Sequence, residues 1–400
     1  MTDPPPIPAG EAARILASIH VTPAMTRYTL TMAGASIVVE LLGLAWCWIV
    51  LASGLSRWIA AKAAGRARPL FASGALYWTG YRAIRWLLFF PASWYLGYRM
   101  PHLYGLSHQG AGLWLWDNIK GWLIDTSIGA VVVGALLVFV RRWPSRWPFV
   151  FAAFASAVTA FLIFISPVLI DKAFNKFTPL PMSSPLRPGI ERLAARAGIP
   201  DAQILVADKS RQTDETNAYV TGLGATRRIV LWDTLIRKMP PEQIDAVLAH
   251  EMGHYVEHHV TIGFWLTTVA FFVLLPLVRW MAEAMIAREG GRWGMATIHE
   301  PAAIPALLLS IGLIELIGSP ISAAASRVIE HRADAYGLTL CQDRVSMARS
   351  FIALSRDNLS LPSPPTWLAL LEDHPPLADR ARFALYGKPS EEWPRPAGSR

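Results

Sequence analysis

The sequence predicts a mainly α-helical integral membrane protein, with about six transmembrane helices and a smaller α+β domain at the membrane boundary. Hydrophobic residues make up 53% of the 400 residues and charged residues only 16%, which is unusual for a soluble protein of this length. The 17 tryptophans agree with this, because tryptophan favours the interface between membrane and water. Polar stretches separate the apolar segments, which indicates a domain outside the bilayer.

Six segments are candidates for membrane spans, because a helix needs about 20 mostly apolar residues to cross the hydrocarbon core. They lie near 31–53, 73–96, 121–141, 148–170, 261–282 and 301–324. The second segment is the weakest candidate, since it contains Arg82 and Arg85. The first segment is too long, and its start too poor in basic residues, for a cleavable signal peptide.

Three acidic residues within these segments need an explanation. Glu40, Asp125 and Glu315 lie in apolar runs, where a charge at the bilayer centre costs roughly 3 kcal/mol. They either pair with charges on neighbouring helices or line a water-filled chamber near the polar domain, and the sequence leaves both explanations open.

The spans divide the chain into six parts. These are a polar N-terminal segment (1–30), a four-helix region (31–170), a polar domain (171–260), a pair of spans (261–324), a second polar part (325–385) and a tail expected to be disordered (386–400). Within the polar domain, helices are expected at 183–199 and 240–259, and strands at 202–208 and within 217–235.

The net charge of +8 points to anionic lipid headgroups rather than to nucleic acid, because the basic residues lie beside apolar runs. The two cysteines, Cys47 and Cys341, lie far apart and imply no disulfide framework. We expect the bilayer as a partner, no nucleic acid, and a monomer.

The segment HEMGH (250–254) carries the clearest chemistry. On a helix, His250 and His254 lie one turn apart on one face, so both imidazoles can reach one metal ion. Glu251 lies beside them and can reach a water molecule on that ion. This is the HExxH pattern of two zinc ligands and a general base, whereas the alternative is an exposed helix with polar pairs. The pattern predicts one zinc ion per chain in a zincin-like α+β metallopeptidase domain.

A third ligand is needed, and His258 is a poor candidate for it. Three histidines at i, i+4 and i+8 of a straight helix lie in a row and cannot surround an ion. The longer pattern HExxHxxGxxH fails here, because Glu257 and Val260 occupy its last two defined positions. We expect His258 and His259 at the membrane surface rather than on the metal.

A second helix offers a better ligand. The segment 326–334 contains Glu330 and, one turn later, Asp334. The last two spans run out and back, so this helix returns to the side of HEMGH. Glu330 could complete the site, and Asp334 could hydrogen-bond the free ring nitrogen of a ligand histidine.

These segments resemble a known family, the type 1 CAAX prenyl proteases, which are membrane-embedded zinc metallopeptidases. The resemblance covers roughly residues 75–385. Its motifs occur here in the family's order: YGLSHQGAGLWLWDNIKGW (104–122), FNKFTPLP (174–181), NAYVTG (217–222), RIVLWDTL (228–235), HEMGH (250–254), SRVIEHRAD (326–334) and HPPLADR (374–380). The eukaryotic members have seven spans, and we expect the missing one within the first seventy residues, which match poorly.

The resemblance implies roles for individual residues. Glu330 would be the third zinc ligand and Glu251 the general base. The strand from Asn217, with Ala218 and Tyr219, would bind the substrate backbone. His374 and Arg380 would lie near the zinc and stabilise the reacting carbonyl.

The function expected from these patterns is that of a membrane-bound zinc metalloendopeptidase. Its substrate would be a prenylated C-a-a-X protein or another membrane-associated protein or peptide. A transporter and a catalytically inactive membrane scaffold are the alternatives. An inactive scaffold would not require the general base Glu251, and a transporter would not require the HExxH pattern, so the sequence favours the peptidase.

The side of the membrane that the site faces is the last expectation. Loops 54–72 and 141–147 are basic, and the positive-inside rule applied to them puts HEMGH outside. The resemblance implies the cytosolic side, and we expect the active site of this multi-pass protein to face the cytoplasm.

Overall fold

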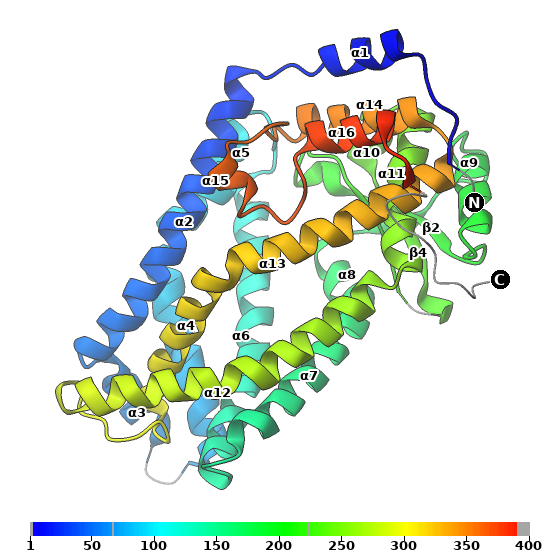
Figure 1. Ribbon diagram of the computed structural model, residues 1–400. Helices are drawn as coiled ribbons and strands as arrows, with labels where there is room; N and C mark the ends of the chain where they lie inside the picture. Colours follow the sequence, from blue (N-terminus) through cyan, green and yellow to red (C-terminus); the bar gives the residue numbers. More distant parts are fainter. Residues whose placement is uncertain (1–2, 66–67, 223, 390–400) are drawn as a thin grey trace.

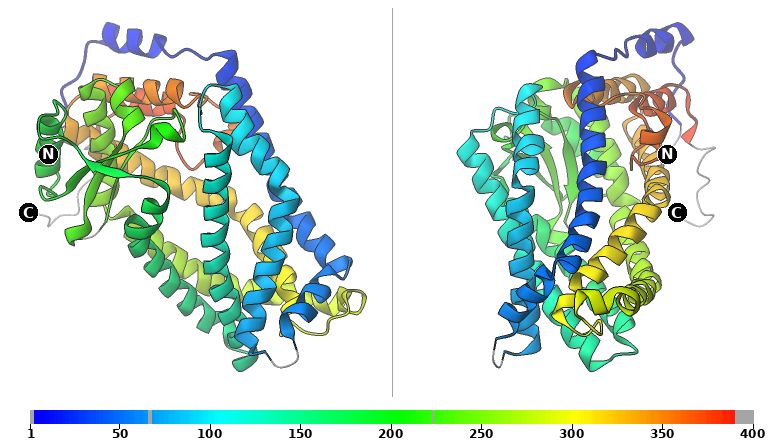
Figure 2. Two further views of the ribbon diagram at one scale, coloured as in Figure 1. Left: turned by 180° about the vertical axis from the view of Figure 1, so that it is seen from behind. Right: turned by 90° about the vertical axis from the view of Figure 1, so that its left-hand side faces the viewer.

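The computed structural model describes residues 3–65, 68–222 and 224–389. Long helices form a splayed bundle, and a small sheet with its own helices lies at one end of this bundle (Figures 1 and 2). The predicted fold class, a helical membrane protein with an α+β domain at one end, is confirmed. Most of the tail expected to be disordered, 386–400, lies outside the described residues.

Among the described residues, five helices are long and apolar enough to cross a membrane. They are α2 (Pro23–Ala52), α6 (Ala111–Arg142), α7 (Trp147–Ile165) with its continuation to Phe174, α12 (His259–Trp293) and α13 (Ile304–Cys341) with the 3₁₀ turn before it (Pro301–Ala303). The predicted span 73–96 forms α4 (Leu70–Trp94), which packs along α6. Its two arginines lower its hydropathy, so the predicted number of six spans is approximate.

The first long helix begins earlier than its apolar run. Thr22 caps α2 because its Oγ1 accepts a hydrogen bond from the Met25 backbone N at 3.2 Å. Pro23 occupies the first turn, where its fixed φ suits a helix start. The helix therefore includes the less apolar residues before Thr31 and extends toward the sheet end of the molecule (Figure 1).

The sheet has four strands in the order β1-β2-β4-β3. Their bounds are Phe177–Pro179 for β1, Gln203–Ala207 for β2, Ala218–Thr221 for β3 and Arg228–Trp232 for β4. The central pair, β2 and β4, is parallel, and the two outer pairs are antiparallel. The short strand β3 therefore lies at an edge of the sheet, with one side unpaired by strands.

One core joins the sheet to its helices α9 (Arg187–Arg196) and α11 (Pro241–Val256). Ile229 and Leu231 of β4 are fully buried against Ile190 of α9 and against Ile244 and Leu248 of α11. Burying an aliphatic side chain of this size contributes about 1.5–3 kcal/mol. This core fixes the position of α11 beneath the sheet.

The first helix of the described chain packs against two of its last helices (Figure 1). Helix α1 (Ala9–Ala17) packs through Ala12 and Ile15 on α14 (Arg344–Asp357) and α16 (Leu377–Tyr386). The remaining short helical segments are α3 (Leu55–Ala64), Tyr95–Arg99, α5 (Met100–Leu103), Ser166–Ile170, α8 (Asp171–Phe174), Lys209–Arg211, Gly224–Thr226, α10 (Asp233–Lys238) and α15 (Thr366–Ala369).

The sequence left two explanations open for the acidic residues within the spans, which were pairing with other charges and lining a chamber. The structure shows one residue that pairs and two that line a cavity. Asp125 on α6 pairs with Arg82 on α4. Glu40 on α2, Arg85 on α4 and Glu315 on α13 line a cavity of about 520 Å³ between these three helices. The residues that line this cavity are separate from those that line the cavity at the candidate metal centre.

Candidate metal centre

Helix α11 carries the HEMGH segment. The helix begins at Pro240 and Pro241, and Glu242 in its first turn suits the positive end of the helix dipole. Its buried face packs on the sheet through Ile244, Val247 and Leu248. His250 and His254 follow one turn apart near the end of the helix.

Helix α13 crosses α11 at close range, and two glycines permit this. A Cβ atom on Gly337 would lie 2.8 Å from the backbone N and Cα of His250, and one on Gly253 would lie 3.0 Å from the Ala333 carbonyl oxygen. Real Cβ atoms essentially never approach as closely as at Gly337 and rarely as closely as at Gly253, so a larger residue at Gly337 would push the helices apart. The close crossing brings Glu330 of α13 to the two histidines.

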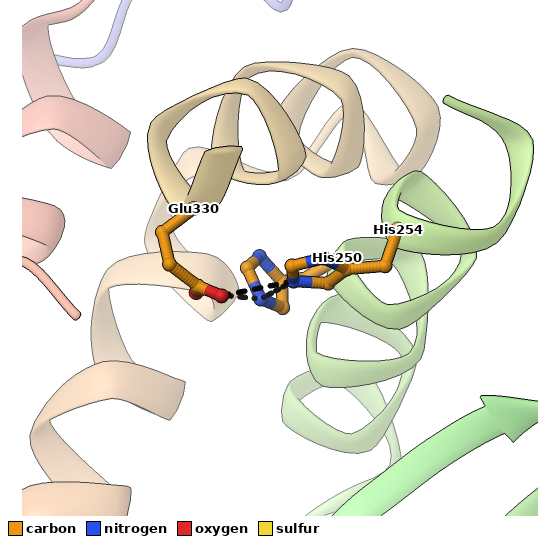
Figure 3. Close-up of side chains that lie close together, drawn as sticks. All are labelled: His250, His254 and Glu330. Carbon is orange, nitrogen blue, oxygen red and sulfur yellow. Dashed lines mark hydrogen bonds and ion pairs between the residues drawn. The ribbon is translucent and has the colours of Figure 1, made fainter. Parts of the chain in front are cut away.

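The ligand atoms of His250, His254 and Glu330 lie within 4.8 Å of one another (Figure 3). The Nε2 atoms of the two histidines are 3.1 Å apart, and they lie 3.5 and 3.3 Å from the Oε2 and Oε1 atoms of Glu330. Glu330 is 6% exposed, and its Oε2 atom is buried without a hydrogen-bond partner in the described part of the chain. A buried carboxylate whose two oxygens each face an imidazole nitrogen, one of these oxygens without a hydrogen bond, fits a metal cation.

Asp334 and Arg380 both contact His250, and Nη2 of Arg380 also lies 3.6 Å from Oε2 of Glu330. The Nδ1 atom of His250 lies 2.9 Å from Oδ1 of Asp334, which is fully buried. Arg380 on α16 donates from Nε to Oδ2 at 2.9 Å and from Nη2 to Oδ1 at 2.7 Å of the same carboxylate. The Asp334 contact holds the proton of His250 on Nδ1 and leaves Nε2 free to bind a metal.

His258 and His259 separate at the end of α11. His258 has a φ of 58° and is exposed, whereas His259 begins α12 and is 6% exposed. The expectation that both histidines lie at the surface is wrong for His259, because the backbone turn at His258 directs His259 inward, against His254. Neither histidine belongs to the ligand cluster found in the described part of the chain. Sequence reasoning did not predict the contact between His259 and His254, because no local pattern in the sequence indicates it.

A cavity of about 380 Å³ opens beside the ligands. His250 and Glu251 line it together with Asn217, His374 and Arg380. Glu251 is partly buried, and this burial raises the pKa of its carboxyl. A carboxyl with a raised pKa beside a metal site is suited to accepting and returning a proton.

His374 and Arg380 approach Glu330 from the C-terminal part of the chain. Nε2 of His374 lies 3.4 Å from Oε1 of Glu330, and its Nδ1 lies 2.7 Å from Oδ1 of Asp373. The Asp373 carboxylate raises the pKa of His374. Arg380 is 6% exposed, and its guanidinium lies 4.4 Å above the ring of Phe351. Both side chains therefore line the cavity, Arg380 from a buried position and His374 from an exposed one.

The predicted substrate-binding residues 217–219 lie in different environments. Asn217 lines the cavity, and its Oδ1 accepts from the backbone N of Ala218 at 2.7 Å. The side chain of Ala218 is buried in the core. Tyr219 points away from the core, and its hydroxyl donates to Oδ2 of Asp171 at 3.2 Å. The structure thus brings the side chain of Asn217 to the cavity, and neither of the other two.

A helical membrane bundle with a histidine-rich metal centre beside a sheet edge defines the chain as an integral membrane metallopeptidase. Comparison with known families agrees. The model of peptidase family M48 matches residues 184–386. The model of the CAAX prenyl protease N-terminal region, described as five membrane helices, matches residues 18–176. The chain belongs to peptidase family M48, and the predicted resemblance is confirmed.

Individual relatives give the same result. A metalloprotease of Bacillus subtilis, YhfN, is 33% identical over 306 residues, which are 74% of this chain and 70% of the relative. CAAX prenyl protease 1 of Saccharomyces cerevisiae is 30% identical over 305 residues, which are 72% and 67% of the two chains. The crystal structure of S. mikatae Ste24p has the same fold, with a TM-score of 0.80 at 24% identity over 94% of each chain. These matches do not favour a transporter or an inactive scaffold.

Proposed function

We propose that this chain is a zinc-dependent endopeptidase that hydrolyses peptide bonds in membrane-associated proteins. One observation carries the proposal: two imidazoles and a buried carboxylate converge beside Glu251, next to a cavity that reaches the edge of the sheet. His250, His254 and Glu330 would hold one zinc ion, because two histidines and a glutamate are a donor set of catalytic zinc. When bound, zinc supplies Lewis acidity, which polarises a carbonyl group and acidifies water.

Glu251 is the general base of the proposed reaction. Its carboxylate takes a proton from the attacking water molecule and holds it while the peptide carbon is attacked. It then passes this proton to the nitrogen of the leaving amine, so that the products are a carboxylate and an amine. The raised pKa of the Glu251 carboxyl suits this transfer.

Arg380 and His374 stabilise the negative charge that develops on the carbonyl oxygen. Donors that are held in place before the reaction are a large part of catalysis, since they need no reorganisation when the charge appears. The bidentate contact of Arg380 with Asp334 supports this role. Asn217 and the open side of β3 bind the substrate backbone as an added strand.

The substrate class that we propose includes prenylated C-a-a-X proteins, because relatives that are 30–31% identical bear the name CAAX prenyl protease 1. A farnesylated peptide should be cut faster than the same peptide without the farnesyl group. Equal rates would restrict the proposal to membrane-associated proteins in general.

The proposed active site faces the cytoplasm, where C-a-a-X proteins are prenylated. The C-terminal end of the described chain lies on the same domain as α9 and β2 (Figure 1). A reporter that is active only in the cytoplasm, fused to the C-terminus, should therefore be active. A silent reporter would place the site outside, as the basic loops 54–72 and 141–147 would predict.

The proposed function is tested with the purified protein and an unstructured substrate, β-casein. The parent chain should contain zinc and cut β-casein. Glu251→Gln should keep the zinc and lose at least about a thousandfold in rate, because the base is removed while the ligands remain. Glu242→Gln is the matched control, since Glu242 is exposed on the same helix. Comparable cleavage by Glu251→Gln would exclude Glu251 as the base.

A further inference from the structure

One side-chain amide occupies the place of a strand partner beside β3. Asn358 follows α14, and its Oδ1 accepts from the backbone N of Thr216 at 2.8 Å. Its Nδ2 donates to the backbone O of Thr216 at 3.1 Å. A residue on a neighbouring antiparallel strand makes the same pair of bonds. The amide of Asn358 therefore replaces one residue of an added strand.

Thr216 stands at the start of the open side of the edge strand. The backbone N of Trp232 donates to the Asn217 carbonyl at 3.1 Å, so the backbone of Asn217 faces β4. Backbone groups alternate in direction along a strand, and those of Thr216, Ala218 and Val220 consequently face the open side. The side-chain amide of Asn358 bonds both the backbone N and the carbonyl of Thr216, which is the first of these three residues.

The turn that carries Asn358 is held tightly. Leu359 has a φ of 50°, which is uncommon for a residue other than glycine. Two bonds close the turn: the Ser360 backbone N donates to the Ser355 carbonyl at 2.9 Å, and the Ser355 Oγ donates to the Ser360 carbonyl at 2.7 Å. The position of Asn358 is thus fixed by its own loop.

The first long membrane helix anchors the same loop. The hydroxyl of Thr29 on α2 donates to the Leu359 carbonyl at 3.0 Å and accepts from the Leu361 backbone N at 3.1 Å. Asn358 is therefore held between the membrane bundle and the sheet. It lines the same cavity as Asn217, His250 and Glu251.

We propose that Asn358 is a specificity-determining residue that sets the register of the substrate on β3. This inference rests on the proposed function, in which the substrate adds to the sheet as a strand. Since Asn358 already pairs with Thr216, an added strand can pair only beyond Thr216. Its first partner there is the Ala218 carbonyl, because the backbone N of Ala218 donates to Oδ1 of Asn217 at 2.7 Å. Side chains along a strand point alternately to the two faces of the sheet. A different pairing of the substrate with β3 that keeps each substrate side chain on its face is therefore displaced by two residues. By closing that register, Asn358 determines which peptide bond lies at Glu251.

The test uses Asn358→Leu, which keeps the approximate size of the side chain. It removes both bonds to the Thr216 backbone and the bond that the Thr216 hydroxyl donates to Oδ1 at 3.3 Å. The probe is a β-casein peptide that the parent enzyme cuts at one bond, and the products are identified by mass spectrometry. In this variant the backbone N and O of Thr216 can bond a substrate strand that is displaced by two residues. These two hydrogen bonds correspond to about a tenfold gain in binding of the substrate in the displaced register. We expect new cleavage two residues from the parent bond, at a tenth or more of the total, and a KM raised about threefold or more.

Two further variants keep the test decisive. Arg356→Gln changes an exposed side chain near Asn358 and keeps the amide and both bonds of the turn, so it should leave the single parent cleavage site unchanged. Asn358→Asp keeps the oxygen that accepts from the Thr216 backbone N and loses the donor to the Thr216 carbonyl. It should therefore give less of the displaced cleavage than Asn358→Leu. If Asn358→Leu does not fold, Asn358→Asp tests the inference in its place. The inference is overturned if the folded, metal-loaded variants of Asn358 cut only the parent bond with unchanged KM. Failure of the parent enzyme to cut any peptide would instead refute the proposed function.

Discussion

The Nδ1 atom of His259 lies 3.0 Å from the Nδ1 atom of His254. The Nε2 atom of His254 faces Glu330 at 3.3 Å, so a metal there leaves the ring proton of His254 on Nδ1. That proton is donated to the Nδ1 atom of His259, which is buried at the start of α12. His259 thus orients one histidine of the candidate metal centre, as Asp334 orients the other.

This relationship predicts that His259→Ala weakens metal binding without removing a ligand. Loss of a partner that orients a ligand typically costs 10- to 100-fold in metal affinity, and we expect a value of this order. Titration with a competing chelator measures it. His258→Ala is the matched control, because the neighbouring His258 is exposed and should have no effect. An affinity of His259→Ala equal to that of the parent would contradict the orienting role.

The ligand set itself gives a second prediction. His250→Ala, His254→Ala and Glu330→Ala should each lose the stoichiometric metal, since a catalytic site with three protein ligands does not tolerate loss of one. Elemental analysis of the purified variants, compared with one ion per parent chain, measures this. If His258→Ala lost the metal while Glu330→Ala kept it, the assignment would be wrong.

The proposed role of Arg380 in catalysis should depend on the shape of its guanidinium group as well as on its charge. Arg380→Lys keeps a positive charge but loses the two-bond contact with Asp334. We expect kcat to fall about 10- to 100-fold with little change in KM or metal content, because a transition-state donor is displaced. Arg382→Lys, on the same helix and exposed, is the control. A variant that raised KM alone would assign Arg380 to substrate binding instead.

The cavity between α2, α4 and α13 should contain water, because Glu40, Arg85 and Glu315 line it. Cysteine at Ser36, which also lines it, should react with a water-soluble thiol reagent after Cys47 and Cys341 are replaced by serine. Cysteine at Leu87 is the comparison, since Leu87 lies on α4, in the predicted span 73–96, outside this lining, and is 66% exposed. Equal, slow labelling at both positions would favour a dry cavity.

The sequence by itself determined the features that depend on local spacing. Apolar runs of sufficient length predicted the membrane helices, because the bilayer imposes that length on any helix that crosses it. The i, i+4 spacing of His250 and His254 predicted their common face and the place of Glu251 beside them, since one helix turn fixes these positions. Glu330 was also within reach of sequence reasoning, because two consecutive spans must return the chain to the side where it started.

Tertiary structure alone decided the contacts between elements. His258 and His259 are neighbours in sequence, yet the left-handed turn at His258 exposes one and buries the other. Arg380 reaches Asp334 across 46 residues, and Asn358 reaches Thr216 across 142. No periodicity encodes such pairs, because they arise where separate helices and loops pack together. Their partners depend on how closely those elements approach, as α13 approaches α11 at Gly337.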